Sequence, residues 1–236
     1  MTEPTPTPVT PPAVPPKPVV ERADQDKQML DRIVGIGQSL ATSQADPEIM
    51  SALKPREFGV EKFAEGVALQ QTALNAYSVR QTAMKAQSQA TSIRTGAETA
   101  ARPMAVEFRD NARRLFPSAA DRTALNLNGK LSRDTQQFIG AARLSYQAAL
   151  KPPYAAIFAA NGYPAAYLNS ALAAVDAFNQ ADETQNAAIG AAVKATADRN
   201  AAFAALDKWM KVYERIAQSA LKTRPDLAKK INLTVK

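Results

Sequence analysis

The side chains with the clearest chemical potential in this sequence are basic, and they gather toward the ends of two long predicted helices. From residue 208 onward eight basic residues face only Glu214 and Asp226, so this end holds most of the net charge of +7. The first group is Arg102, Arg109, Arg113 and Arg114, and the second is Lys208, Lys211, Arg215, Lys222, Arg224, Lys229 and Lys230. Such groups predict binding of an anionic partner, and parallel long helices would bring both groups to one end of the protein.

Two observations weigh against a nucleic-acid site. Cations near helix C-termini are also what the helix macrodipole favours. A specific nucleic-acid binder would in addition show stacking aromatic residues or a recognition motif, and the sequence shows neither. We therefore rank nucleic acid below a protein partner or self-association.

Catalytic side chains are sparse. The sequence contains no cysteine and no histidine, which excludes disulfides, thiolate nucleophiles, Cys/His zinc sites, histidine bases and Glu-x-x-His di-iron sites. Gly35 begins a Gly-Ile-Gly-Gln-Ser string, which lacks the lysine and the preceding strand of a phosphate loop. The acids lie scattered among basic and amide neighbours, as on solvated helix faces: Asp134, Asp176, Asp182, Glu183, Asp198 and Asp207. We expect no enzyme and no catalytic, metal or cofactor site.

The elements that position these residues are helices. The chain holds 9 glycines, alanine makes up nearly half of its 46% hydrophobic residues, and no longer stretch alternates with a period of two. This pattern predicts an all-α protein. We expect longer helices at residues 24–43, 59–116 with a kink or break at Pro103, 132–150 and 164–221, and short helices after Asp46, Ser118, Pro153 and Pro225.

Two helices of about 58 residues and two shorter ones predict an elongated up-down bundle packed as a coiled coil. The middles of the long helices, residues 78–102 and 179–200, are alanine-rich and polar. Small side chains bury little apolar area. A narrow alanine-packed bundle is the simpler interpretation of these middles, and a contact face for another copy of the chain is the alternative.

The two halves of the chain, residues 24–117 and 129–222, repeat one order of elements. Each half has a shorter helix, a short helix opened by proline and a long helix. At an offset of 105 residues the following pairs coincide: Gly35/Gly140, Pro47/Pro152, Phe58/Tyr163, Arg94/Arg199, Phe108/Tyr213 and Phe116/Leu221. We expect an internal duplication, which requires the two long helices to correspond from end to end.

The only tryptophan lies in a dense apolar stripe of the last long helix. By the expected pseudo-symmetry, Trp209 and its neighbours should pack on Phe108, Leu115 and Phe116, and an aromatic ligand groove is the alternative. The string Leu206-Asp207-Lys208-Trp209-Met210 is followed by Ile216-Ala217, Ala220-Leu221 and Pro225-x-Leu227. From Tyr163 to this end the chain resembles a group of uncharacterised all-helical bacterial proteins. The resemblance implies a helical fold and no known activity.

The N-terminal stretch differs from the rest of the chain. Residues 1–22 hold half of the 16 prolines and predict a disordered tail, which is a linker or a ligand for a proline-binding module. Residues 23–236 are expected to form one domain. The sequence shows no apolar signal region and no run near 18 apolar residues, so we expect no transmembrane segment. The expected location is cytoplasmic, or periplasmic if a signal peptide was removed.

Three function classes follow from these observations. A non-enzymatic structural scaffold or protein-interaction bundle ranks first, because the chain offers long helices and no assembled catalytic set. A coat on apolar surfaces is the first alternative, since alanine- and glutamine-rich amphipathic helices with a Pro/Ala-rich tail resemble phasins. A binder of an anionic partner through the basic end is the second alternative.

Overall fold

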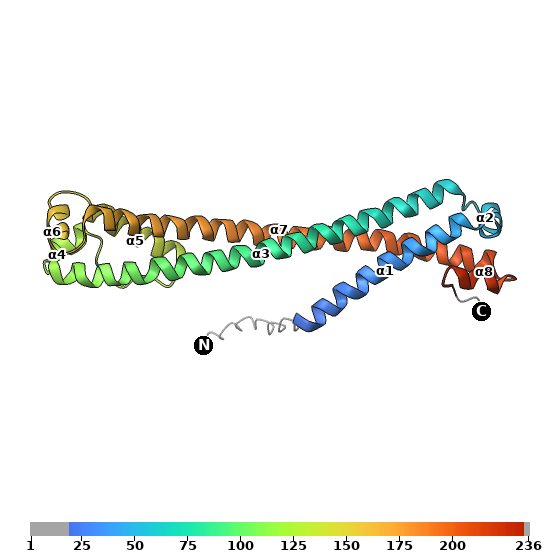
Figure 1. Ribbon diagram of the computed structural model, residues 1–236, viewed down its shortest axis with the longest axis horizontal. Coiled ribbons are helices and arrows are strands. Elements are labelled where there is room, and N and C mark those ends of the chain that lie inside the picture. The colour runs from blue at the N-terminus through green and yellow to red at the C-terminus, as the bar shows by residue number, and fades with distance from the viewer. Residues whose placement is uncertain (1–18, 234–236) are drawn as a thin grey trace, which may run out of the picture. The chain divides into compact units, whose positions relative to one another are not determined.

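The computed structural model describes residues 19–233, with backbone alone for residues 19–23, and this range contains helices and no strand (Figure 1). The all-α prediction is confirmed. Residues 1–18, most of the predicted tail, lie outside the described residues. The helices are α1 (Val19–Ala45), α2 (Pro47–Leu53), a 3-10 turn (Lys54–Arg56), α3 (Val60–Leu115), α4 (Ala119–Ala124), α5 (Thr135–Ala149), α6 (Tyr154–Ala160), α7 (Ala165–Ala220) and α8 (Pro225–Lys230).

Capping side chains set the starts of three helices, α2, α4 and α5. The Asp46 carboxylate accepts from the backbone N–H groups of Glu48 and Ile49 and so opens α2, as predicted. Ser118 caps α4 in the same way. For α5, which was expected to begin at residue 132, the cap is Asp134 and the helix begins at Thr135. The Ser132 hydroxyl accepts from the backbone N–H of Asp134 at 3.1 Å, in the turn that precedes the helix.

Pro103 does not divide α3. The helix runs unbroken from Val60 to Leu115 with this proline inside it. The expected break is therefore wrong. Proline removes one backbone donor, but the helix on both sides of Pro103 is fixed by buried contacts of Ala101 and Ala105.

The described chain forms two compact units. Unit 1 combines residues 19–77, which hold α1, α2 and the start of α3, with residues 200–233, which hold the end of α7 and α8. Unit 2 is the continuous stretch Ser78–Arg199, with the rest of α3 and α7 and the whole of α4, α5 and α6. Within each unit α3 and α7 pack against each other and run antiparallel. In unit 1, Phe63 near the start of α3 contacts Tyr213 near the end of α7, and in unit 2, Phe108 near the end of α3 contacts Tyr163 just before α7.

Aromatic rings form the core of unit 1. Trp209 stacks on Tyr213 with ring centroids 5.7 Å apart and an interplanar angle of 9°. The ring of Phe58 contacts both, each at 5.4 Å, and Phe63 meets Tyr213 edge-on at 5.8 Å. Gly66 permits this packing, because a Cβ atom there would come within 2.4 Å of the Trp209 ring. The expected packing of Trp209 on Phe108, Leu115 and Phe116 is wrong, and those residues belong to the core of unit 2.

Unit 2 has its own aromatic core. Phe108 lies at its centre and contacts Tyr146 at 4.7 Å, Phe158 at 5.2 Å and Tyr163 at 5.6 Å. These rings come from α5, from α6 and from the residues just before α7, so they fasten the short helices to the long pair. In Figure 1, α5 lies alongside α3 and α7 within this unit.

The two long helices correspond from end to end. Both have 56 residues, and α7 begins and ends 105 residues after α3. The ring contact Phe58–Tyr213 of unit 1 matches the contact Tyr163–Phe108 of unit 2 under the same offset, with the roles of the two helices exchanged. These observations are what the internal duplication requires; the duplication itself stays a prediction.

A second correspondence escaped the sequence comparison. After α4 and after α8 the chain reads Leu125-Asn126-Leu127 and Ile231-Asn232-Leu233. In both strings the asparagine has a left-handed backbone conformation, with φ of 53° and 58°. The backbone N–H of Leu127 donates to the carbonyl oxygen of Arg122 at 2.7 Å, and that of Leu233 donates to the carbonyl oxygen of Ala228 at 2.9 Å. Both short helices therefore end in the same C-terminal capping turn.

Candidate functional site

The predicted basic residues of unit 2 serve mainly structural roles. Arg109 is 3% exposed and donates to the carbonyl oxygens of Asn126 at 2.8 Å and Asn128 at 3.2 Å, so it holds the loop after α4. Burial lowers the pKa of the Arg109 guanidinium from its ordinary value. Arg113 binds the carbonyl of Leu127 at 2.7 Å. Of this group only Arg114 is exposed with no partner among residues 19–233.

The predicted basic residues of unit 1 divide into paired and unpaired side chains. Lys211 pairs with Asp207 at 2.9 Å, Arg224 with Glu48 at 2.6 Å and Asp226 at 3.0 Å, and Lys230 with Asp46 at 2.7 Å. Within the described part of the chain Arg215, Lys222 and Lys229 are exposed and show no acidic partner.

The two basic groups belong to different units, the arginines of α3 to unit 2 and the basic residues from Lys208 onward to unit 1. Parallel long helices, the condition under which the two groups would meet, are not found, since α3 and α7 run antiparallel within each unit. Many of the cations are moreover committed to ion pairs or loop carbonyls. Binding of an anionic partner stays a prediction.

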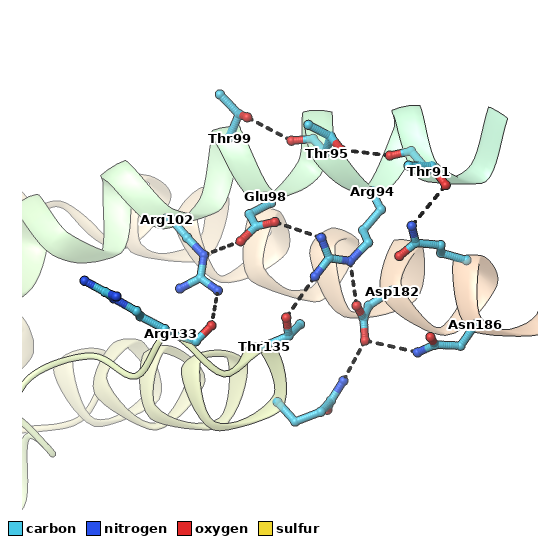
Figure 2. A network of polar contacts seen from close by, with 12 residues as sticks. Thr91, Arg94, Thr95, Glu98, Thr99, Arg102, Arg133, Thr135, Asp182 and Asn186 are labelled. Carbon is cyan, nitrogen blue, oxygen red and sulfur yellow. Dashed lines mark hydrogen bonds and ion pairs between the residues drawn. The ribbon is translucent and has the colours of Figure 1, made fainter. Parts of the chain in front are cut away.

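The richest polar cluster of unit 2 lies where α5 begins (Figure 2). The Arg94 guanidinium donates to Asp182 of α7 at 2.7 Å, to Glu98 of its own helix at 2.8 Å and to the Thr135 hydroxyl of α5 at 2.8 Å. Arg102 donates to the other Glu98 oxygen at 2.5 Å. One guanidinium thus joins three helices through charge-assisted hydrogen bonds.

This cluster is chemically saturated. Each carboxylate is held by a guanidinium, and Asp182 also accepts from the Gln136 amide at 3.1 Å. The hydrogen bond from Arg102 is the main cause that lowers the pKa of Glu98. A general acid or base needs a pKa near the working pH. A carboxylate whose pKa is lowered by arginines, as that of Glu98 is, suits a structural clamp better than proton transfer.

Beyond this clamp lies a stretch in which unit 2 supplies only two helices. Residues 78–93 of α3 and 186–199 of α7 form what we call the two-helix segment, entered by a hydrogen bond from Gln185 to Thr91 at 3.0 Å. Its buried apolar residues are alanines: Ala90, Ala192 and Ala195. Its most exposed large apolar residues are branched: Val79, Ile93 and Val193, exposed by 59%, 65% and 66%. Alanines therefore fill the contact between the two helices, while these branched side chains remain exposed to solvent.

A groove of about 480 Å³ opens in unit 1 between the start of α3 and the end of α7. Its apolar lining comes from Phe58, Leu69, Ala205, Trp209, Val212 and Ile216, and its charged rim from Arg56, Glu57, Lys62, Glu65 and Lys208. The sequence signal for this groove was the aromatic stripe around Trp209. The sequence analysis gave a ligand groove only as the alternative to a closed core. The structure shows features of both, since Trp209 is 8% exposed, as in a core, and still lines the groove.

The fold places the chain among all-α helical bundles, and comparison with known proteins adds no closer assignment. No family model, no curated protein and no solved structure matches the chain. None of the described helices is both long enough and apolar enough to cross a membrane. Groups of acidic side chains that could hold a metal ion are likewise absent from residues 19–233.

Proposed function

We propose that this protein is a non-enzymatic structural bundle that associates through the two-helix segment. The observation that carries the proposal is the exposure of Val79, Ile93 and Val193 on a pair of helices whose own contact is made by alanines. Val79 and Ile93 are two heptads apart, so they lie on one stripe of α3. On α7, Ile189 and Val193 are one helical turn apart and share a stripe in the same way.

The energetics favour a further helical surface on this segment. Burying a valine or isoleucine completely contributes about 1.5–3 kcal/mol, and more than half of each of these three side chains still contacts solvent. An alanine contact contributes much less, because its apolar area is small. A second copy that covers these stripes would supply the large apolar contacts that the segment lacks. The Arg94–Asp182 clamp at one end would hold the two helices in register for that contact.

The proposal is tested by the molar mass of the full chain in solution, measured by light scattering over a wide concentration range. We expect a defined oligomer. The double substitution Val79→Gln and Ile93→Gln should weaken association at least tenfold, since about 1.4 kcal/mol of lost apolar contact suffices.

The matched control is Val106→Gln with Leu144→Gln. Both residues lie in unit 2, are exposed by 48% and 56%, and lie outside the two-helix segment. This control should keep the oligomer. A chain that stays monomeric at every concentration, or an oligomer that the control variant dissolves equally well, would overturn the proposal.

A further inference from the structure

The groove beside Trp209 is a built concavity and not a gap between loosely packed helices. Its volume of about 480 Å³ falls in the range of small-molecule sites, which are mostly apolar with a few polar groups. Trp209 is fixed from behind by Tyr213, stacked at 5.7 Å, and from the side by Phe58 at 5.4 Å. Gly66 lets the indole lie against α3, where a Cβ atom would collide with it.

Two of the groove positions correspond to tyrosines in unit 2. At the offset of 105 residues, Tyr167 takes the place of Lys62, and Tyr163 takes the place of Phe58. The two tyrosine rings contact at 5.2 Å, and the Tyr163 hydroxyl accepts a hydrogen bond from Asn111. In unit 1 the side chain at the Tyr167 position is a lysine, whose ammonium pairs with Glu65 at 2.8 Å. The position that holds an aromatic ring in unit 2 therefore holds a flexible, charged side chain in unit 1.

The rim of the groove carries uncompensated positive charge. Lys62 is neutralised by Glu65. The Arg56 guanidinium donates to two carbonyl oxygens, those of Ala52 and Ser219, and keeps its charge. Lys208 is exposed and has no acidic partner among residues 19–233. Against these two cations stands one unpaired rim carboxylate, Glu57. An occupant of complementary chemistry has an apolar body and one negative group at its end.

We propose that this groove binds a free long-chain carboxylate, with the alkyl chain against Trp209, Leu69 and Val212 and the carboxylate near Lys208. The two features of the groove that select this ligand are its apolar floor and its cationic rim. A cationic amphiphile satisfies only the first of them, and inorganic phosphate satisfies only the second. This inference does not depend on the two-helix segment, which lies in the other unit.

The experiment uses the full chain and monomeric dodecanoate, kept below its micelle concentration. Trp209 is the only tryptophan, so its emission reports on the groove without a label. We expect a saturable change in emission with dodecanoate and at least tenfold weaker binding of dodecyltrimethylammonium. Inorganic phosphate should give no change.

Two variants separate groove binding from general adhesion. Ala205→Phe places a ring on the exposed lining of the groove and should weaken dodecanoate binding at least tenfold, whereas Ala204→Phe, exposed on the same helix but outside the lining, should bind normally. Lys208→Glu should weaken binding about threefold, as for loss of an exposed ion pair. Unchanged far-UV circular dichroism would show that each variant is folded.

Several results would overturn the proposal. These are the absence of a saturable change, equal affinity for the cationic amphiphile, an unaffected Ala205→Phe variant, or binding of anionic lipid vesicles without binding of monomeric dodecanoate. Vesicle binding alone would indicate a surface that adheres to lipid headgroups and not a site for the free acid.

Discussion

Two tyrosines make a sharp test of how this fold treats buried hydroxyl groups. Tyr146 in unit 2 and Tyr213 in unit 1 are both 0% exposed. The Tyr213 hydroxyl shares a hydrogen bond of 2.6 Å with the Ser43 hydroxyl, whereas the Tyr146 hydroxyl has no hydrogen-bond partner within the described residues. The same substitution, tyrosine to phenylalanine, removes one oxygen atom at each site. We expect the two variants to change stability in opposite directions.

The magnitudes follow from the difference between a satisfied and an unsatisfied polar group. Tyr213→Phe loses one hydrogen bond, which costs about 1 kcal/mol of unfolding free energy. Tyr146→Phe removes a buried hydroxyl whose lost hydration costs the native state roughly 1–3 kcal/mol, and part of that cost is regained. We expect Tyr146→Phe to be about 1 kcal/mol more stable than the parent chain. The two variants should then differ by about 2 kcal/mol.

The assay is urea denaturation followed by far-UV circular dichroism, with Trp209 emission as a probe of unit 1. An unchanged dependence on urea concentration would show that the midpoint reports stability. A destabilised Tyr146→Phe would mean that its hydroxyl is hydrogen-bonded in the folded protein, and it would refute the reasoning. So would a Tyr213→Phe variant as stable as the parent chain.

Tyr146 also predicts that the stability of the protein depends on pH in the alkaline range. Burial raises the pKa of the Tyr146 hydroxyl above its ordinary value of 10.0. The unfolded chain therefore ionises first. The unfolding free energy is unaffected by this ionisation below about pH 10, and it falls as the pH rises from there toward the folded pKa. Tyr146→Phe should lose less stability than the parent chain above that pH, measured by urea midpoints at increasing pH.

Further predictions concern the glycines of α3 and the clamp. Gly66→Ala should lower the unfolding free energy by about 1–3 kcal/mol, because the new methyl group meets the fixed Trp209 ring. Gly96→Ala has open space around it and should raise the unfolding free energy by about 0.5–1 kcal/mol. Thermal melts of both variants check this, and equal shifts in melting temperature would contradict the close packing at Gly66. Because Arg102 and Arg94 lower the pKa of Glu98 from 4.5, the stability that its charge contributes is present above about pH 4.5 and is lost as the pH falls through the folded value. Glu98→Gln should flatten this acid-side loss in urea midpoints, and an unchanged pH profile would contradict the assignment.

The sequence was sufficient to predict where the helices lie along the chain, but insufficient to predict which residues of different helices pack together. The long stretch between Pro164 and Pro225 contains no proline, and α7 runs where that absence predicts it. The error about Pro103 arose because helix propensity reflects the backbone N–H that proline lacks, but not the tertiary contacts of the buried alanines on either side. The wrong partner for Trp209 arose because an internal repeat fixes which residues correspond but not whether the two long helices run parallel or antiparallel.

The sequence also could not show which of the predicted basic residues would be buried or paired. The charge count found the arginines near the end of α3, but it could not show that Arg109 would be buried on loop carbonyls. Charge patterns reveal where cations lie along a helix and not which backbone oxygens a later loop will present. The repeated Leu-Asn-Leu and Ile-Asn-Leu strings were readable in advance, and a comparison that allowed a shift of one residue after the long helices would have found them.

Unit 1 is built from two separate stretches of the chain, and this has a consequence for its folding during synthesis. Translation delivers every residue of unit 2, Ser78–Arg199, before the last segment of unit 1 exists. Until residues 200–233 leave the ribosome, Phe58 and Phe63 have no tryptophan or tyrosine to cover them. At about 5–20 residues per second this interval lasts many seconds, long enough for a chaperone that recognises exposed apolar helices to act. The first helices to be synthesised are therefore among the last to be completed.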